Sequence, residues 1–132
     1  RCTSSAASDV YKRQEENLKV ISTYHNQNYD IRVFNDSLKE LNIRQFKEMP
    51  LKLLSRGNIQ RNKLCLAMNL NWDYLLIDEP FSNLDTDGIK IFKDIFNNFK
   101  SNNRSIIYST HQNYQELNYD KIISIESFKG IK

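Results

Sequence analysis

The most constraining feature of this sequence is a short apolar run, residues 74–77, which ends in two adjacent carboxylates, Asp78 and Glu79. A run of this length, rich in Leu and Ile, is typical of a strand buried on both faces of a parallel sheet. Open α/β sheets bind their ligands at the carboxyl ends of the strands, so the two acids would lie in a ligand crevice. Buried carboxylates need a cation or hydrogen-bond donors. A metal ion bound to phosphate would meet this requirement.

The composition limits the class of protein. The chain has 132 residues, of which 39% are hydrophobic and 27% charged, and this fits one globular domain or a part of one. The formal net charge of +3, with both signs interspersed, gives little support for a nucleic-acid partner. Cys2 and Cys65 lie far apart without a Cys-x-x-Cys pattern or a His cluster, so a reducing cytosolic compartment fits better than a zinc site or a disulfide framework. No apolar stretch approaches the roughly 20 residues of a membrane span, so a membrane role would come through a partner.

The first 14 residues differ from the rest of the chain because they are rich in Ser and Ala and lack apolar periodicity. They resemble translated adapter or vector sequence, and a native flexible arm is the alternative. We expect residues 1–14 to be a non-native or disordered leader, residues 15–58 a helical subdomain, and residues 59–132 a C-terminal α/β part. If the leader is foreign, the chain is a piece of a longer gene product whose true beginning is missing.

Helical spacing of apolar residues predicts four helices, and a short helical piece is expected near residues 114–117. The four helices are predicted at residues 18–24, 31–41, 59–70 and 89–99. Pro50 keeps the connector before the third helix from being helical through residue 49. Thr86 or Asp87 can cap the fourth helix, which follows a turn rich in small polar residues.

Two further strands are predicted after the one that precedes Asp78 and Glu79. Residues 104–109 contain Ile106, Ile107 and Tyr108, and His111 follows at the carboxyl end of this strand. Residues 121–126 make the third strand. Strands that alternate with helices predict a parallel sheet with right-handed crossovers, and therefore an α/β fold.

Ser55 and Gly57 precede the third predicted helix and have two interpretations. Ser55 is a candidate N-cap, and taken alone this is the simpler reading. Alternatively, Gly57 lets a phosphate approach the backbone, where free N–H groups and the positive end of the helix attract an anion. Asp78 and Glu79 have a similar alternative, because they could merely cap the following turn.

Four separated features follow one another in a fixed order: Leu54-Ser55-x-Gly57 with Gln60-Arg61, then Leu-Leu-Ile-Asp78-Glu79-Pro80, then Ser82-x-Leu84-Asp85, then Ser109-Thr110-His111. Together they resemble the ATP-binding-cassette (ABC) ATPases over essentially residues 16–126. The resemblance implies a P-loop NTPase-like parallel sheet with a helical signature subdomain, and it implies ATP and Mg²⁺ as cofactors.

The resemblance also implies roles for single residues. Ser55, Gly57 and Asn58 match the signature loop, which contacts the γ-phosphate of ATP held by the other subunit of a head-to-tail dimer. Asp78 matches the aspartate that holds Mg²⁺, and Glu79 the base that orients the attacking water. These are tasks of positioning and charge compensation, which phosphoryl transfer requires.

Two more residues match parts of the family site beyond the central strand. Asp85 ends the D-loop that couples the two sites of the dimer. His111 matches the switch histidine, which contacts the γ-phosphate and the loop that carries the base.

The sequence departs from the family pattern at three points. Arg56 replaces the first glycine of Leu-Ser-Gly-Gly-Gln, and Asn58 replaces its glutamine. No Gly-x-x-x-x-Gly-Lys-Ser/Thr pattern occurs, and the chain's three glycines cannot form one. We therefore expect that the N-terminal phosphate-loop portion of the fold is missing and that this piece alone is inactive.

Residues 78–88 and the later Ser-Thr-His-Gln run, which ends at Gln112, most resemble the ATP-binding subunit of the haem exporter of cytochrome c maturation. This implies an ATP-hydrolysing transporter subunit that works with transmembrane subunits on the cytoplasmic face of the bacterial cell membrane. Another transporter ATPase is the alternative, as is an ABC ATPase associated with nucleic acid or ribosomes. A third possibility is a non-catalytic module that supplies only signature and D-loop surfaces in trans.

Overall fold

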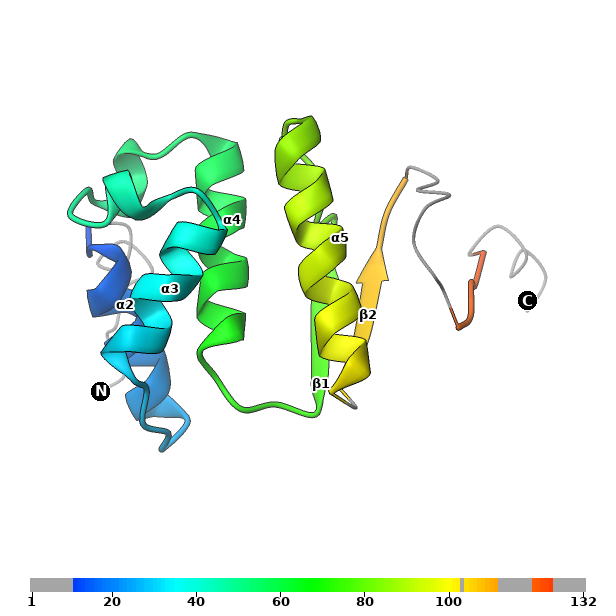
Figure 1. Ribbon diagram of the computed structural model, residues 1–132, viewed down its shortest axis with the longest axis horizontal. Coiled ribbons are helices and arrows are strands. Elements are labelled where there is room, and N and C mark those ends of the chain that lie inside the picture. The colour runs from blue at the N-terminus through cyan, green and yellow to red at the C-terminus, as the bar shows by residue number, and fades with distance from the viewer. Residues whose placement is uncertain (1–10, 103, 112–119, 125–132) are drawn as a thin grey trace, which may run out of the picture.

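The computed structural model describes residues 11–102, 104–111 and 120–124. The N-terminal half is helical, with α2 (Gln14–Tyr24), α3 (Ile31–Glu40), the short 3-10 helices η1 (Arg44–Phe46) and η2 (Leu51–Leu53), and α4 (Arg56–Met68). The strand β1 (Tyr74–Asp78), the helix α5 (Thr86–Ser101) and the strand β2 (Ser105–Ser109) follow. Figure 1 shows α4 between the other N-terminal helices and the layer formed by α5 and the strands.

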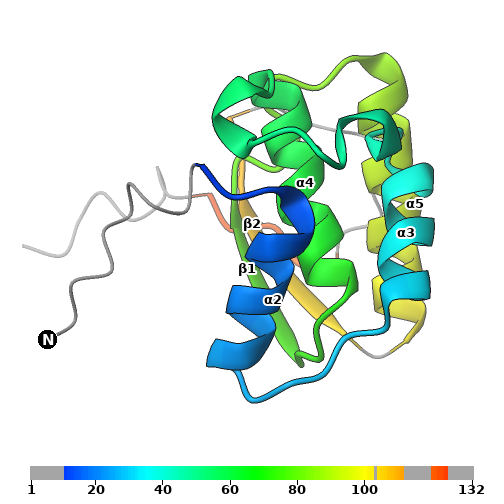
Figure 2. The same ribbon diagram turned by 90° about the vertical axis from the view of Figure 1, so that its left-hand side faces the viewer.

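The two described strands are parallel neighbours, in a register that pairs Tyr74 with Ser105 and Asp78 with Ser109. This β–α–β unit confirms the predicted α/β alternation for residues 74–109. Both strands therefore end at the same edge of the sheet. Figure 2 shows them side by side, with α5 on one side of them.

A single apolar cluster joins the helical half to the strands. Each buried aliphatic or aromatic side chain in it contributes about 1.5–3 kcal/mol relative to an exposed one. Its buried members are Leu18, Phe34, Leu38, Leu41, Ile43, Leu64, Cys65, Phe81, Phe92, Ile95, Phe96 and Phe99. Because α3, α4 and α5 all contribute to the cluster, the loops at their ends are held at fixed positions.

The central strand differs from its prediction in one respect. Burial alternates along both strands, and Leu76 and Ile107 are 76% and 58% exposed. Leu75 and Ile77 pack against the core on the opposite face. The prediction of burial on both faces is therefore wrong for the described chain, because only one face of the sheet packs against the described core.

Other boundaries also differ from the sequence prediction. Residues 121–124 form no strand, so that part of the third predicted strand is wrong, and residues 125–126 lie outside the described residues. The helical piece expected at residues 114–117 also lies outside them. The expected boundary after residue 58 falls inside α4, which begins at Arg56.

The described residues begin inside the expected leader. Gln14 starts α2 and is fully buried, and its Nε2 donates a hydrogen bond to the Phe46 carbonyl at 3.0 Å. Arg13 pairs with Glu48 at 2.8 Å. Residues 13 and 14 are thus packed against the η1 region, whereas the origin of the leader stays a prediction.

Candidate functional site

The carboxyl ends of β1 and β2 bring the first expected site residues together. Asp78 is the last residue of β1 and lies opposite Ser109, the last residue of β2. The Ser109 hydroxyl donates a hydrogen bond to Asp78 Oδ1. Asp78 points to the exposed face of the sheet. A carboxylate and a hydroxyl at this edge are the hard oxygen ligands that Mg²⁺ prefers, so the donor set fits the implied metal.

Glu79 turns its carboxylate toward the segment that follows β2. Its Oε1 accepts a hydrogen bond from the backbone N–H of His111 at 2.9 Å, and its Oε2 lies 3.5 Å from the hydroxyl of Thr110. The backbone N–H of Glu79 donates to the Ser109 carbonyl at 3.1 Å, which extends the pairing of the strands by one residue. These donors compensate the partial burial of the Glu79 side chain, which is 29% exposed.

His111 lies where the sequence predicted a switch histidine. Its Nε2 is 3.6 Å from Glu79 Oε1, and its side chain is 97% exposed. The ring is therefore open to a ligand from solvent and also close to the carboxylate.

Ser55 is the N-cap of α4, as its simpler reading predicted. Its hydroxyl accepts a hydrogen bond from the backbone N–H of Asn58 at 3.2 Å. Gly57 has a structural reason of its own, because a Cβ there would lie 2.5 Å from the carbonyl oxygen of Asn83. The first turn of α4 thus lies directly against the loop that contains residues 82–85. The segments that the resemblance assigned to the signature loop and the D-loop are therefore neighbours within this one chain.

Asp85 caps α5, where the sequence predicted Thr86 or Asp87, and that prediction was wrong. Asp85 Oδ1 accepts from the backbone N–H of Gly88 at 2.8 Å and from Arg61 Nη2 at 2.6 Å. The hydrogen bond from Gly88 and then the positive charge of Arg61 hold the pKa of Asp85 below its usual value. The carboxylate of Asp85 thus has two partners, the backbone N–H of Gly88 and the side chain of Arg61.

Gln60 and Arg61 of α4 contact the loops of the candidate site. Both were part of the first sequence motif, but no role was assigned to them there. Arg61 is 7% exposed, and besides Asp85 it donates to the Leu41 carbonyl at 2.9 Å. Gln60 is 8% exposed and donates to the carbonyls of Glu79 and Pro80. The only sequence signal for them is their position directly after the signature loop.

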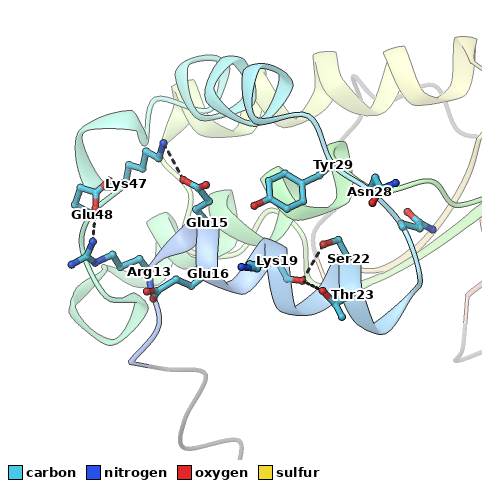
Figure 3. Close-up of a pocket in the computed structure, with 11 residues that line it drawn as sticks. Arg13, Glu15, Glu16, Lys19, Ser22, Thr23, Asn28, Tyr29, Lys47 and Glu48 are labelled. Atoms are coloured by element: carbon cyan, nitrogen blue, oxygen red, sulfur yellow. Dashed lines mark hydrogen bonds and ion pairs between the residues drawn. The ribbon is translucent and has the colours of Figure 1, made fainter.

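A separate cleft lies in the helical half, between α2 and the η1 region (Figure 3). Its volume is about 450 Å³, and charged side chains dominate its lining. The Lys47–Glu15 and Arg13–Glu48 ion pairs, at 3.2 and 2.8 Å, span part of its rim. None of the expected site residues lines this cleft.

The arrangement combines a carboxylate at a strand end, a second carboxylate oriented by backbone and side-chain donors, and an exposed histidine next to it. Such groups can hold a hydrated cation and orient a water molecule. Among the described residues, no group of three or more His, Cys, Asp or Glu side chains could hold a metal ion without further ligands. No described helix has the length and apolar character needed to cross a bilayer.

Comparisons with curated proteins identify relatives. No protein-family model matches the chain. An uncharacterized ABC transporter ATP-binding protein of Methanocaldococcus jannaschii is 37% identical over 75 residues, which is 57% of this chain and 29% of that protein. A cytochrome c biogenesis ATP-binding export protein of Vibrio vulnificus is 27% identical over 100 residues, covering 74% of this chain and 47% of that protein. The chain thus spans less than half the length of these relatives.

Solved structures agree on the fold. An ATP-binding protein of Pyrococcus furiosus assigned to ABC transporters superposes with a TM-score of 0.68 at 23% identity, over 80% of this chain and 52% of that one. The cbiO1 protein of Clostridium perfringens, part of the ABC transporter complex cbiONQ, superposes with a TM-score of 0.56 at 20% identity, over 77% of this chain and 42% of that one. The predicted fold class, P-loop NTPase-like α/β, is therefore confirmed for the part of the domain present here.

Proposed function

Since the homologues of this chain are ABC transporter ATP-binding proteins and its fold is that of part of an ABC ATPase domain, we propose that it supplies the carboxylate half of a transporter's ATP-hydrolysing site. The observation that carries the proposal is the meeting of Asp78, Glu79 and His111 at one edge of the sheet. A capping role alone would not place all three there.

Each residue has a role that its contacts support. Asp78, fixed by the Ser109 hydroxyl, holds Mg²⁺, commonly through water. When bound, the ion neutralises charge on the phosphates of ATP. Glu79 orients the attacking water and accepts its proton, and the donors from Thr110 and His111 aim its carboxylate. His111 contacts the γ-phosphate from its exposed position.

The signature and D-loop residues act across a dimer in this proposal. Ser55, Gly57 and Asn58 face the γ-phosphate held by a second nucleotide-binding subunit, and Asp85 lies at the contact between the two sites. The close packing of Gly57 on the Asn83 carbonyl supports a shared surface made of both segments. The 132 residues contain no Gly-x-x-x-x-Gly-Lys-Ser/Thr pattern, so in this proposal the phosphate-binding loop has to be supplied to the site separately, and the chain alone does not turn over ATP.

The transporter setting is the finer part of the proposal. The protein works with transmembrane subunits at the cytoplasmic face of the membrane, and haem export for cytochrome c biogenesis is the cargo we favour. The match to the Vibrio vulnificus protein and the residues Phe81, Asp87, Gly88 and Gln112 support this cargo. Transport of another cargo is the alternative, because other relatives are uncharacterized ABC transporter proteins. Co-purification with membrane subunits, followed by identification of those subunits, separates the two.

The decisive test replaces the proposed base. In an ATPase that contains this chain together with a phosphate-binding loop, Glu79→Gln should abolish turnover and leave ATP binding intact, because the amide cannot accept the proton. Glu40→Gln is the matched control, since Glu40 is an exposed acid at the end of α3. Steady-state hydrolysis and nucleotide titration measure the two quantities. Undiminished hydrolysis by the Glu79 variant would remove the base role.

A further inference from the structure

A buried glutamine of α4 contacts the turn that carries the proposed base. Gln60 lies in the second turn of the helix and is 8% exposed. Its Nε2 donates to the carbonyl oxygens of Glu79 and Pro80, both at 3.1 Å. The nitrogen of one side-chain amide therefore bonds to two consecutive peptide units, 19 and 20 residues away in sequence.

The turn that receives these bonds has a strained backbone. Glu79 has a φ of 47°, in the left-handed region that non-glycine residues rarely adopt. Such conformations persist only where the surroundings fix them. The Glu79 carbonyl also accepts from the Ser82 N–H at 3.2 Å, and Pro80 is fully buried. Gln60 bonds to this turn from the helical side.

We propose that Gln60 is a positioning residue for ATP hydrolysis, which keeps Glu79 in its left-handed conformation and so aims the carboxylate at the attacking water. The inference rests on the proposed role of Glu79 as the base. Gln60 acts through its hydrogen bonds to the backbone of residues 79 and 80. With this backbone conformation, the Glu79 side chain reaches His111, whose backbone N–H donates to Glu79 Oε1.

The variants are chosen to remove or replace the N–H donors of the Gln60 side chain. Gln60→Leu has a similar size and no donor. Gln60→Glu keeps the shape, but its carboxylate has no N–H and faces two carbonyl oxygens until it is protonated. Gln14→Leu is the matched control, because Gln14 is also buried and donates its Nε2 to a backbone carbonyl, that of Phe46, in another part of the molecule.

The first experiment needs no nucleotide. The Cα and Cβ chemical shifts of Glu79, measured by NMR on the 132-residue chain, report the left-handed backbone directly. We expect Gln60→Leu to move these shifts away from left-handed values and Gln14→Leu to leave them unchanged. If Gln60→Leu does not fold, Gln60→Glu at neutral pH carries the same expectation. Glu79 shifts identical to those of the unmodified chain in the variant that folds would overturn the proposal.

The second experiment measures the catalytic consequence in an ATPase that contains this chain and a phosphate-binding loop. Misplacement of a reacting group by about 1 Å can cost on the order of 10²-fold in rate, so kcat should fall by about that factor in Gln60→Leu. KM for ATP should change by less than about twofold, because Gln60 is buried and its side-chain amide bonds to the backbone of residues 79 and 80. For Gln60→Glu, kcat relative to the unmodified enzyme should rise as the pH falls, because the protonated acid regains one donor.

The outcomes separate this inference from the proposed function. Unchanged kcat in Gln60→Leu, or loss of activity entirely through KM, would overturn the positioning role. If Gln60 had a purely structural role, its variants would give less folded enzyme. The kcat of Gln60→Glu relative to the unmodified enzyme would then not rise as the pH falls. If the unmodified assembly hydrolyses no ATP, the proposed function fails, and the NMR result still decides whether Gln60 holds the turn.

Discussion

Gly57→Ala is the substitution for which the structure gives the clearest energy estimate. The new methyl group would lie 2.5 Å from the Asn83 carbonyl oxygen, well inside van der Waals contact. The oxygen cannot move away easily, because Asn83 lies between the buried Phe81 and the capping Asp85, and its own φ is 60°. The first turn of α4 and the loop must therefore separate.

The change in the free energy of unfolding caused by Gly57→Ala combines a gain in helix propensity with the cost of a steric clash. Ala is more favourable than Gly in a helix by up to about 1 kcal/mol. Forcing an extra methyl group into a packed contact costs about 1–3 kcal/mol. We expect Gly57→Ala to lower the free energy of unfolding by about 1 kcal/mol, the difference between these two terms.

Urea unfolding followed by far-UV circular dichroism, without nucleotide, measures this free energy. Arg56→Ala is the control, because Arg56 is exposed in the same helical turn, and its stability should stay within about 0.5 kcal/mol of the unmodified chain. A Gly57→Ala chain at least as stable as the unmodified one would refute the reasoning, since the helix-propensity term would then be the only one acting. Gly57 would in that case be required for phosphate approach alone.

Two further predictions concern titrating groups. The pKa of Asp85 is lowered by the Gly88 N–H and then by Arg61, so its contribution to stability is present above the unfolded pKa of about 3.9 and is lost as the pH falls through the folded pKa. Asp85→Asn keeps a capping oxygen but removes this acid-dependent part, and urea unfolding between neutral and acid pH should show a flatter profile than the unmodified chain. Burial raises the pKa of the Cys65 thiol to about 12, so in a Cys2→Ser chain iodoacetamide at pH about 8 should label Cys65 slowly when folded and quickly in urea. Fast labelling of the folded chain would contradict the burial of Cys65.

The sequence predicted the features that depend on local patterns. The apolar run before Asp78, the helical spacing of Phe92, Ile95 and Phe99, and the position of His111 after a strand all appear in the structure. Each depends on residues within a few positions of one another, for which hydrophobic periodicity is a sufficient guide.

Features that depend on distant partners were not predictable in this way. The exposure of Leu76 depends on which elements cover the second face of the sheet. Asp85, the N-cap of α5, also accepts a hydrogen bond from Arg61, 24 residues earlier. Gln60 contacts the backbone of Glu79 because α4 packs beside the end of β1. No local pattern contains these pairings, since they arise only when the chain is packed.

The packing of α4 also separates the positions of the signature segment that can vary from those that cannot. Gly57, Gln60 and Arg61 each meet a carbonyl or carboxylate of the site loops. Arg56 is exposed, and Asn58 gives the cap only its backbone N–H, so the side chains at these two positions can change without disturbing the loops. These are the two positions where the sequence departs from Leu-Ser-Gly-Gly-Gln. A search pattern of the form Ser-x-Gly-x-x-Gln-Arg therefore follows the physical constraint more closely than the five-residue signature does.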